Sequence, residues 1–359
     1  MKISQLVSCL NPVSSATSSA IYSHVGALCD GLTIKGHKVF LYASGDSQTN
    51  AELVSVYPIA LNLVPKISER EKNFYTDSLI SKCYKNASKY DLIHSHFTIL
   101  SSFYQNFVKT PTLISVHSPI DKIMKTFLKE FKSLRYISFS LAQRKQMPEL
   151  NWYANIYHGV DTKKFAFNPN PEDYFLYLGR VTEDKGAHLA IEAAKKAGVK
   201  LVIAGRSYQG EGYWHSHIEK NIDGKNITYI GEQNSEQKIP YLQKAKGLIF
   251  PTQCEEVFGY SMIEAMSCGT PVIGWNIGAI PEVIKDGKTG YVVNSVEEMA
   301  EAMKNIDNIS RKETRTRAEA FFSIKKMITG YQNVYQRVLG EIAYKKDRRL
   351  KKEKDALKA

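Results

Sequence analysis

Short apolar segments alternate with helical patterns along the second half of the chain, and this alternation constrains the fold more than any other feature. We predict strands at 174–178, 200–204, 227–230, 247–250, 271–275 and 291–293. Helical patterns such as 187–197 and 260–268 lie between them. Strands that are apolar on both faces and separated by helices indicate a parallel sheet covered on both sides.

The first half repeats this scheme less regularly, with strands predicted at 2–8, 39–43, 92–95, 112–116 and 136–140. A break at 165–171, which holds two prolines and two asparagines, predicts a linker. The chain of 359 residues is long enough for two doubly wound domains. We therefore predict an α/β fold with Rossmann-like parallel-sheet domains at 1–165 and 166–325 facing a cleft. A helix at about 326–345 would return to the first domain, and 346–359 would form a basic tail.

Composition narrows the class of protein. The chain is 43% apolar and 23% charged, as in ordinary globular proteins. It contains no run of the ~20 apolar residues that a membrane span requires, and its first residues resemble a strand rather than a signal peptide. Its five cysteines include no Cys-x-x-Cys pair, which argues against a disulfide framework and a zinc site. We expect a reducing, cytoplasmic compartment.

The positive charge is distributed unevenly. Residues 1–165 hold 19 basic and 11 acidic residues, 166–340 hold 21 of each, and 341–359 hold 8 basic and 4 acidic residues. An anionic partner would therefore meet the first half or the tail. The neutral second half, together with the lack of a basic and aromatic readout motif, argues against nucleic acid as that partner.

The segment 255–272 carries the most specific chemical pattern. Glu256 lies in a loop after a predicted strand, and Gly259 opens a predicted helix that Gly269 closes. A glycine at a helix start lets an anion approach main-chain N–H groups. Glu264, inside the same helix, offers a carboxylate that can accept hydrogen bonds from two vicinal hydroxyls, as in a ribose. Glu256, at the helix start, would face the group beyond the phosphates.

A second pattern follows the first strand of the second half, at Gly179-Arg180-Val181-Thr182-Glu183-Asp184-Lys185-Gly186. A guanidinium offers a planar fork to phosphate oxygens, and an ammonium offers a mobile point charge. Arg180 and Lys185 are therefore candidate ligands of a diphosphate.

Together these segments resemble glycosyltransferase family 4, retaining enzymes of the GT-B fold with an E-x7-E motif. The resemblance implies a nucleotide-diphosphate sugar as donor and a hydroxyl acceptor that is lipid-linked, a glycan or a small molecule. It implies no cofactor and no metal, and no Asp-x-Asp pair occurs in the chain. The catalytic residues implied are Glu256, His117, Arg180 and Lys185. The donor-binding residues implied are Arg180, Lys185, Lys238, Phe258, Gly259, Tyr260 and Glu264.

One position departs from the family pattern. Family members usually carry a Gly-Gly pair in the loop after the first strand, where the backbone approaches the donor phosphates. Here Ser19 and Ala20 take that place, and without glycine a positive φ becomes costly. Beside a hexosyltransferase, this departure leaves open a non-catalytic donor-binding partner of an active paralogue. A GT-B sugar-nucleotide epimerase, which shares the domains and the donor but uses no acceptor, is a second alternative.

A basic amphipathic pattern lies at 121–135. At helical spacing Ile123, Phe127, Phe131 and Leu134 share one stripe, and four lysines project from the rest of the helix. Such a helix can lie in a membrane interface. We therefore hypothesise peripheral contact with the anionic inner face of a membrane, assisted by the basic tail.

Overall fold

The computed structural model describes residues 1–15, 17, 19–208 and 212–356, with side chains up to residue 348. The chain forms two compact units. Unit 1 contains Met1–Ser138, Met147–Ile156 and Met327–Ala359, and unit 2 contains Phe139–Gln146 and Tyr157–Lys326. The chain thus passes between the units at four places.

Unit 1 is built on a seven-stranded sheet in the order β3-β2-β1-β4-β5-β6-β7, with every pairing parallel. Its strands are β1 Lys2–Leu6, β2 Lys38–Tyr42, β3 Glu52–Val54, β4 Leu92–Ser95, β5 Thr112–Ser115, β6 Arg135–Ser138 and β7 Trp152–Asn155. Its helices are α1 Ala20–Ile34, α2 Glu69–Lys85, α3 Leu100–Gln105, α4 Lys122–Leu128 and, from Met327 onward, α12 Ile324–Ala356.

Strand β1 shows how the two faces of this sheet are covered. Its side chains alternate, so Ser4 and Leu6 face α2, where the Ser4 hydroxyl lies 3.1 Å from the Cys83 thiol. Gln5 points the other way, and its amide reaches the Tyr335 hydroxyl of α12 at 3.0 Å. The last helix of the chain therefore covers the sheet that the first strand begins.

Unit 2 is built on a six-stranded parallel sheet in the order β10-β9-β8-β11-β12-β13. Its strands are β8 Phe175–Leu178, β9 Leu201–Ala204, β10 Ile227–Tyr229, β11 Gly247–Phe250, β12 Val272–Trp275 and β13 Gly290–Val293. Its helices include α5 Leu141–Lys145, α6 Ala187–Ala197, α7 Lys238–Lys244, α8 Tyr260–Ser267, α9 Ile280–Val283, α10 Val296–Lys304 and α11 Arg311–Phe322.

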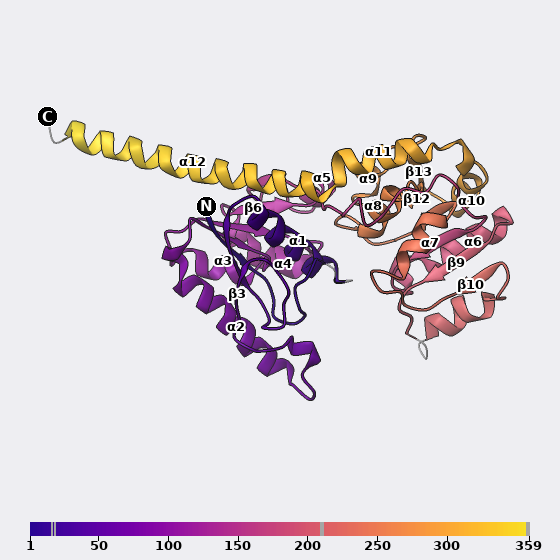
Figure 1. Ribbon diagram of the computed structural model, residues 1–359, viewed down its shortest axis with the longest axis horizontal. Coiled ribbons are helices and arrows are strands. Elements are labelled where there is room, and N and C mark those ends of the chain that lie inside the picture. The colour runs from indigo at the N-terminus through magenta and orange to yellow at the C-terminus, as the bar shows by residue number, and fades with distance from the viewer. Residues whose placement is uncertain (16, 18, 209–211, 357–359) are drawn as a thin grey trace. The chain divides into compact units, whose positions relative to one another are not determined.

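Helices lie on both faces of this sheet (Figure 1), and each face carries its own hydrophobic cluster. Phe175 and Tyr177 pack with α6 and α10 on one face. Leu176, between them in the sequence, packs with α7, α8 and α11 on the other face. Because both faces are covered, the strands read as continuous apolar segments in the sequence.

Both predicted parallel sheets are present, and the α/β prediction is confirmed. Each of the eleven predicted strands overlaps an observed strand, whereas β3 and β7 were not predicted. The segment 165–171, interpreted as a linker, lies inside unit 2, where the Asn168 N–H donates to the Cys268 carbonyl at 3.0 Å. Residues 346–356 continue α12 as helix.

The helix observed in the segment 121–135 is shorter than the amphipathic helix that we hypothesised there. Helix α4 ends at Leu128, a 3-10 turn covers Lys129–Phe131, and Leu128 and Leu134 are buried. Of the large apolar side chains in this segment, Ile123 and Phe127 are exposed, at 68% and 47%.

Candidate functional site

The strand order of unit 2 reverses between β8 and β11, which are hydrogen-bonded neighbours. Ligands of open α/β sheets bind outside the carboxyl ends of the strands at such a point. The loop after β8 carries Arg180 and Lys185, and the loop after β11 carries Glu256. The fold therefore brings together segments that are about seventy residues apart in the chain.

The loop after β8 is held close to the end of the neighbouring strands. The Tyr177 hydroxyl donates to the Arg180 carbonyl at 2.7 Å, and the Val181 N–H donates to the Arg206 carbonyl at 2.9 Å. Gly186 closes the loop with φ of 73°, and a Cβ there would lie 2.2 Å from the Pro251 carbonyl oxygen. No larger residue fits this approach, so Gly186 sets the position of Lys185 against the end of β11.

Lys185 forms an ion pair with Glu256 and lies 3.5 Å from the Cys254 sulfur. Burial alone would lower the pKa of the Lys185 ammonium, but the attraction and hydrogen bond of Glu256 outweigh it and raise that pKa. Arg180 differs, because its side chain is 58% exposed and its guanidinium lies 4.0 Å from the Asp184 carboxylate.

The main chain of Glu256 rests on a turn that follows β12. The Ala279 N–H donates to the Glu256 carbonyl at 3.1 Å. Gly278 has φ of 54°, and a Cβ there would lie 2.6 Å from the same carbonyl oxygen. Gly278 was not predicted as a site residue, although, like Gly179, it lies in a loop after a strand.

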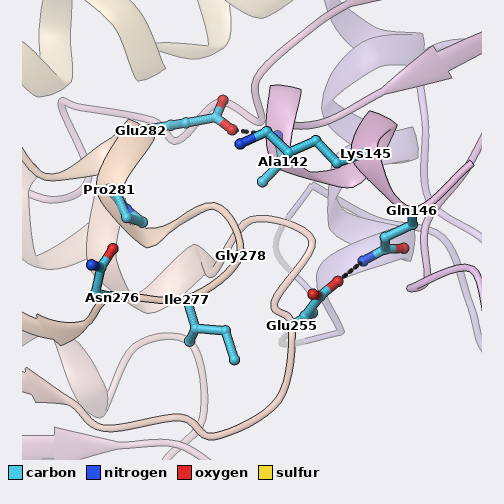
Figure 2. A pocket seen from close by; sticks show the side chains of 9 residues that line it. All are labelled: Ala142, Lys145, Gln146, Glu255, Asn276, Ile277, Gly278, Pro281 and Glu282. Atoms are coloured by element: carbon cyan, nitrogen blue, oxygen red, sulfur yellow. Dashed lines mark hydrogen bonds between the residues drawn. The ribbon is translucent and has the colours of Figure 1, made fainter. Parts of the chain in front are cut away.

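Glu255, the neighbour of Glu256, belongs to a different environment. It lines a pocket of about 500 Å³ within unit 2, together with residues of α5 and of the turn at 276–282. Its carboxylate accepts a hydrogen bond from the Gln146 amide at 2.6 Å, and the Glu282 carboxylate accepts from the Ala142 N–H at 2.6 Å (Figure 2). The two adjacent glutamates therefore have separate partners, Gln146 for Glu255 and Lys185 for Glu256.

Helix α8 begins directly after Gly259, which has φ of 95°. The N–H groups of its first turn lack intrahelical acceptors, and the helix dipole favours an anion near them. Tyr260 lies at this start, with its hydroxyl 3.2 Å from the His158 Nδ1. The Phe258 side chain is instead packed in the core against Tyr157 and Phe322, so only its main chain is available to a ligand.

Glu264 faces Lys238 from the interior of α8. The Lys238 Nζ lies 2.5 Å from the Glu264 carboxylate, and both side chains are largely buried. Burial raises the pKa of the Glu264 carboxyl, while Lys238 opposes that rise. Four of the predicted residues of unit 2 thus form two ion pairs, Lys185–Glu256 and Lys238–Glu264, while Arg180 is exposed.

The remaining predicted residues lie in unit 1. His117 follows β5 and is half-buried, with its Nε2 2.8 Å from the His96 Nδ1. Ser19 precedes α1 with φ of −77°, and Ala20 is the first residue of the helix. Any residue can adopt the backbone conformation of these two positions. The presence of serine in place of the first glycine of the family's Gly-Gly pair therefore causes no backbone strain.

Within the described part of the chain, no three His, Cys, Asp or Glu side chains are grouped as metal ligands. No helix among the described residues is long and apolar enough to cross a membrane.

Comparison with known proteins identifies the family. Residues 23–164 match glycosyltransferase family 4, and residues 160–321 match the glycosyl transferases group 1. An uncharacterised glycosyltransferase of Methanocaldococcus jannaschii is 25% identical over 270 residues, which are 68% of this chain and 75% of that protein. The matches to three further curated relatives span less than half of their length.

Two solved structures share the fold. Sucrose-phosphate synthase from Thermosynechococcus elongatus superposes with a TM-score of 0.75 at 20% identity, over 95% of this chain and 99% of that chain. Anabaena HepE in complex with UDP-glucose superposes with a TM-score of 0.69 at 15% identity, over 94% of this chain and 99% of that chain. Since the two family matches run from residue 23 to residue 321 and both sheets follow this fold, the chain belongs to the family 4 (group 1) glycosyltransferases of the GT-B fold.

Proposed function

We propose that this glycosyltransferase moves a hexose-type sugar from a nucleotide-diphosphate donor to a hydroxyl acceptor. The observation that carries the proposal is the convergence of Arg180, the Lys185–Glu256 pair and the start of α8 at the switch point of the sheet. A diphosphate needs cations and N–H donors together, as this place offers them. The complex of Anabaena HepE with UDP-glucose, in the same fold, supports this class of donor.

The ion pairs suggest how the donor would be received. A diphosphate would compete with Glu256 for the Lys185 ammonium, which would release the Glu256 carboxylate to accept from sugar hydroxyls. Glu264 would accept from the two ribose hydroxyls while keeping Lys238 as its counter-ion. The Lys185–Glu256 pair thus holds its charges in place until the donor replaces this contact, and the Lys238–Glu264 pair stays intact, which limits reorganisation during the reaction.

The same cations account for a reaction without a divalent metal. As the sugar–phosphate bond breaks, negative charge grows on the diphosphate, where Arg180, Lys185 and the α8 dipole would stabilise it. We further propose retention of the anomeric configuration, by attack of the acceptor hydroxyl on the face that the diphosphate leaves. We expect that EDTA leaves the activity unchanged. We also expect an α-linked product from an α-linked donor. Activity that returns only with Mg²⁺ or Mn²⁺ would contradict the metal-independent part.

A thermal-shift screen against UDP, GDP, ADP and their sugar conjugates tests the donor class. A ligand at 100 times its Kd stabilises the folded state by about 2.7 kcal/mol, so one nucleotide should raise the melting temperature clearly. Incubation of that sugar nucleotide with candidate acceptors then distinguishes the alternatives. A new glycoside indicates a transferase, an altered donor sugar indicates an epimerase, and binding without turnover indicates a non-catalytic partner. The absence of any nucleotide-dependent shift would refute the proposal.

We also propose that unit 1 contacts an anionic membrane surface near its acceptor. Four large apolar side chains of α3, the following loop and α4 are exposed: Phe103, Phe107, Ile123 and Phe127. The Phe103 ring packs at 5.5 Å from the ring of Phe131, which connects α3 to the turn after α4. The same α4 segment and the turn after it carry exposed lysines, as in surfaces that bind anionic headgroups.

Sedimentation with vesicles tests this contact. Binding to anionic vesicles should exceed binding to neutral vesicles and should decrease as salt screens the lysines. Phe127→Ser combined with Ile123→Ser should reduce binding, whereas Ile34→Ser, at a more exposed apolar position on α1, should not. Failure to bind either vesicle type at low salt would refute the proposed membrane contact. It would not contradict the proposed binding of the donor.

A further inference from the structure

The pocket of about 500 Å³ that Glu255 lines is a second cavity feature of unit 2, and its lining residues are distinct from the predicted donor-binding residues. Helix α5 forms one side of this pocket, and the loop after β11 and the turn at 276–282 form the other side (Figure 2). A volume of this size is within the range of sites that bind small molecules. The pocket is therefore a candidate site for a second ligand.

Glu282 fixes the position of α5 against the rest of the pocket. Its carboxylate accepts hydrogen bonds from the Leu141 N–H at 2.8 Å and from the Ala142 N–H at 2.6 Å. The Tyr157 hydroxyl donates to the same carboxylate at 3.0 Å. These three donors occupy most of the acceptor sites of the carboxylate. The two sides of the pocket are therefore tied together without a ligand.

The polar side chains in the lining offer both acceptors and donors to a ligand. The Glu255 carboxylate has about four acceptor sites, and the Gln146 amide occupies one of them at 2.6 Å. The exposed Asn276 amide lies in the same lining, where its Nδ2 donates to the Asn294 Oδ1 at 3.0 Å. A hydroxyl both donates and accepts, so hydroxyls match a surface on which a carboxylate and amides lie close together.

The charges in the pocket disfavour an anionic ligand. Glu255 and Glu282 contribute two carboxylates to the lining, whereas Lys145 contributes one ammonium. Ile277 and Pro281 add apolar surface, which can pack against C–H groups. A pyranose ring presents hydroxyls at its rim and C–H groups on its faces, and it carries no charge. The lining therefore fits a neutral sugar better than a phosphate or a purely apolar molecule.

The pocket and the predicted donor site share one segment of main chain. Glu255 and Glu256 are consecutive, with Cα atoms about 3.8 Å apart, and their side chains have separate partners, Gln146 and Lys185. A Cβ at Gly278, which lines the pocket, would lie 2.6 Å from the Glu256 carbonyl oxygen and 2.9 Å from its nitrogen. A sugar held by Glu255 would therefore lie next to a sugar held by Glu256.

We propose that this pocket binds a neutral, hydroxyl-rich sugar residue, and that the Glu255 carboxylate accepts hydrogen bonds from its hydroxyls. In the transfer reaction the pocket is the subsite that holds the acceptor beside the transferred sugar, which makes the acceptor a glycan. This role in the reaction rests on the proposed function, whereas the binding of a sugar to the pocket does not require a donor.

Nitrogen NMR of the full chain, titrated with methyl glycosides, tests the pocket directly. The probes are the methyl glycosides of glucose, mannose, galactose and N-acetylglucosamine, with putrescine and inorganic phosphate as charged comparisons. The side-chain amide signals of Gln146 and Asn276, identified through Gln146→Leu and Asn276→Leu, report on the lining. At least one glycoside should shift both signals until they saturate. The absence of a saturable shift with every glycoside, or a shift with putrescine or phosphate alone, would overturn the proposal.

Two variants test whether the sugar binds at Glu255. Glu255→Ala removes an exposed carboxylate and should weaken glycoside binding about tenfold, the effect of one hydrogen bond to a charged group. Ala142→Leu narrows the pocket without removing a polar group and should abolish glycoside binding. Glu192→Ala, at an exposed glutamate of α6 outside the pocket, is the matched control. Glycoside affinities of both pocket variants that equal the affinity of the control would refute the proposal.

Addition of the sugar nucleotide distinguishes an acceptor subsite from a part of the donor site. The sugar nucleotide selected by the thermal-shift screen should leave the glycoside bound or convert it to a disaccharide, because the two ligands occupy neighbouring places. Displacement of the glycoside would show that the pocket belongs to the donor and would overturn the proposal. Binding of the glycoside without any binding of a nucleotide would instead refute the proposed function and leave the sugar site of unit 2 in place.

Discussion

Arg180 differs from the other cations predicted to bind the donor. Lys185 and Lys238 are held by Glu256 and Glu264, whereas Arg180 is exposed and lies 4.0 Å from Asp184. An exposed guanidinium contributes little to the free energy of unfolding. Its fork is therefore available to an anion without loss of an existing strong contact.

Arg180→Ala should weaken the binding of the nucleoside diphosphate by about 1.5–3 kcal/mol, the range for hydrogen bonds to charged groups. Titration calorimetry measures this change, and the melting temperature should stay near that of the wild type. Arg70→Ala removes an exposed arginine of unit 1 and should leave the affinity unchanged. Equal affinities of Arg180→Ala and wild type would show that Arg180 does not contact the diphosphate.

Glu264→Gln separates binding from stability. Because burial raises the pKa of Glu264, the fold disfavours its ionised form, and a neutral amide of the same shape avoids this cost. The amide oxygen can still accept from Lys238, so the free energy of unfolding should change by less than about 1 kcal/mol. Donor affinity should fall, because the charge-assisted bonds to the ribose are lost. Unfolding of the variant with affinity retained would instead identify Glu264 as structural.

At the scale of elements, α11 secures unit 2 through arginines that bind main-chain carbonyls. Arg311 donates to the carbonyls of Asn168, Gln243 and Ala245, at 2.8 to 2.9 Å. Arg315 donates to those of Thr162 at 2.8 Å, Phe165 at 2.6 Å and Ser267. The carbonyl at Ser267 ends α8, so these contacts fix the helix that carries Glu264.

Arg315→Ala should lower the free energy of unfolding of unit 2 by about 3 kcal/mol, because three carbonyls lose their donor. Arg315→Lys should recover part of this loss, since an ammonium lacks the planar fork. Chemical denaturation followed by Trp275 fluorescence, with the other tryptophans replaced by phenylalanine, reports on unit 2. Lys312→Ala, at an exposed position of the same helix, serves as the control. A loss as small as that of the control would contradict this role of Arg315.

At the scale of the whole molecule, unit 1 is complete only when the last helix returns to the first strand. Tyr335 of α12 contacts Gln5 of β1 and His94 of β4. Gly31 of α1 leaves room for Ile328 of α12, since a Cβ at Gly31 would lie 2.0 Å from the Ile328 Cδ1. The stability of unit 1 therefore depends on residues from both ends of the chain.

The stability of unit 1 should decrease between pH 7.5 and pH 5. Burial lowers the pKa of His94 to about 3, while the unfolded chain binds a proton near pH 6.5. In this pH range the unfolded state binds more protons than the folded state. The contribution of neutral His94 to the stability of unit 1 is therefore present above pH 6.5 and is lost as pH falls. His94 alone contributes about 2 kcal/mol to this difference.

Denaturation at both pH values, followed by Trp152 as the tryptophan of unit 1, measures the effect. His94→Gln should reduce the difference, and His215→Gln, at an exposed position of unit 2, should not. A difference of the same size in wild type and His94→Gln would contradict the assignment to His94.

The sequence by itself predicted the two parallel sheets and eleven of their strands. It did so because a strand covered on both faces reads as a continuous apolar segment, and because glycines mark where strands end. It missed β3, which has three residues, and β7, whose residues are all partly exposed, because neither carries a continuous buried pattern. The sequence also placed Glu256 in the loop before a helix and Glu264 inside that helix. The local spacing of the residues is sufficient for this prediction.

Only the tertiary structure decided which of these residues meet. Lys185 and Glu256 are 71 residues apart, and Gln5 and Tyr335 are 330 apart. The sequence pattern states which side of a strand or helix is apolar, but strand order and packing decide which loops end side by side. For that reason Glu256 could be named from the sequence, whereas its pairing with Lys185, the separate environment of Glu255 and the contact between Gln5 and Tyr335 depend on the folded chain.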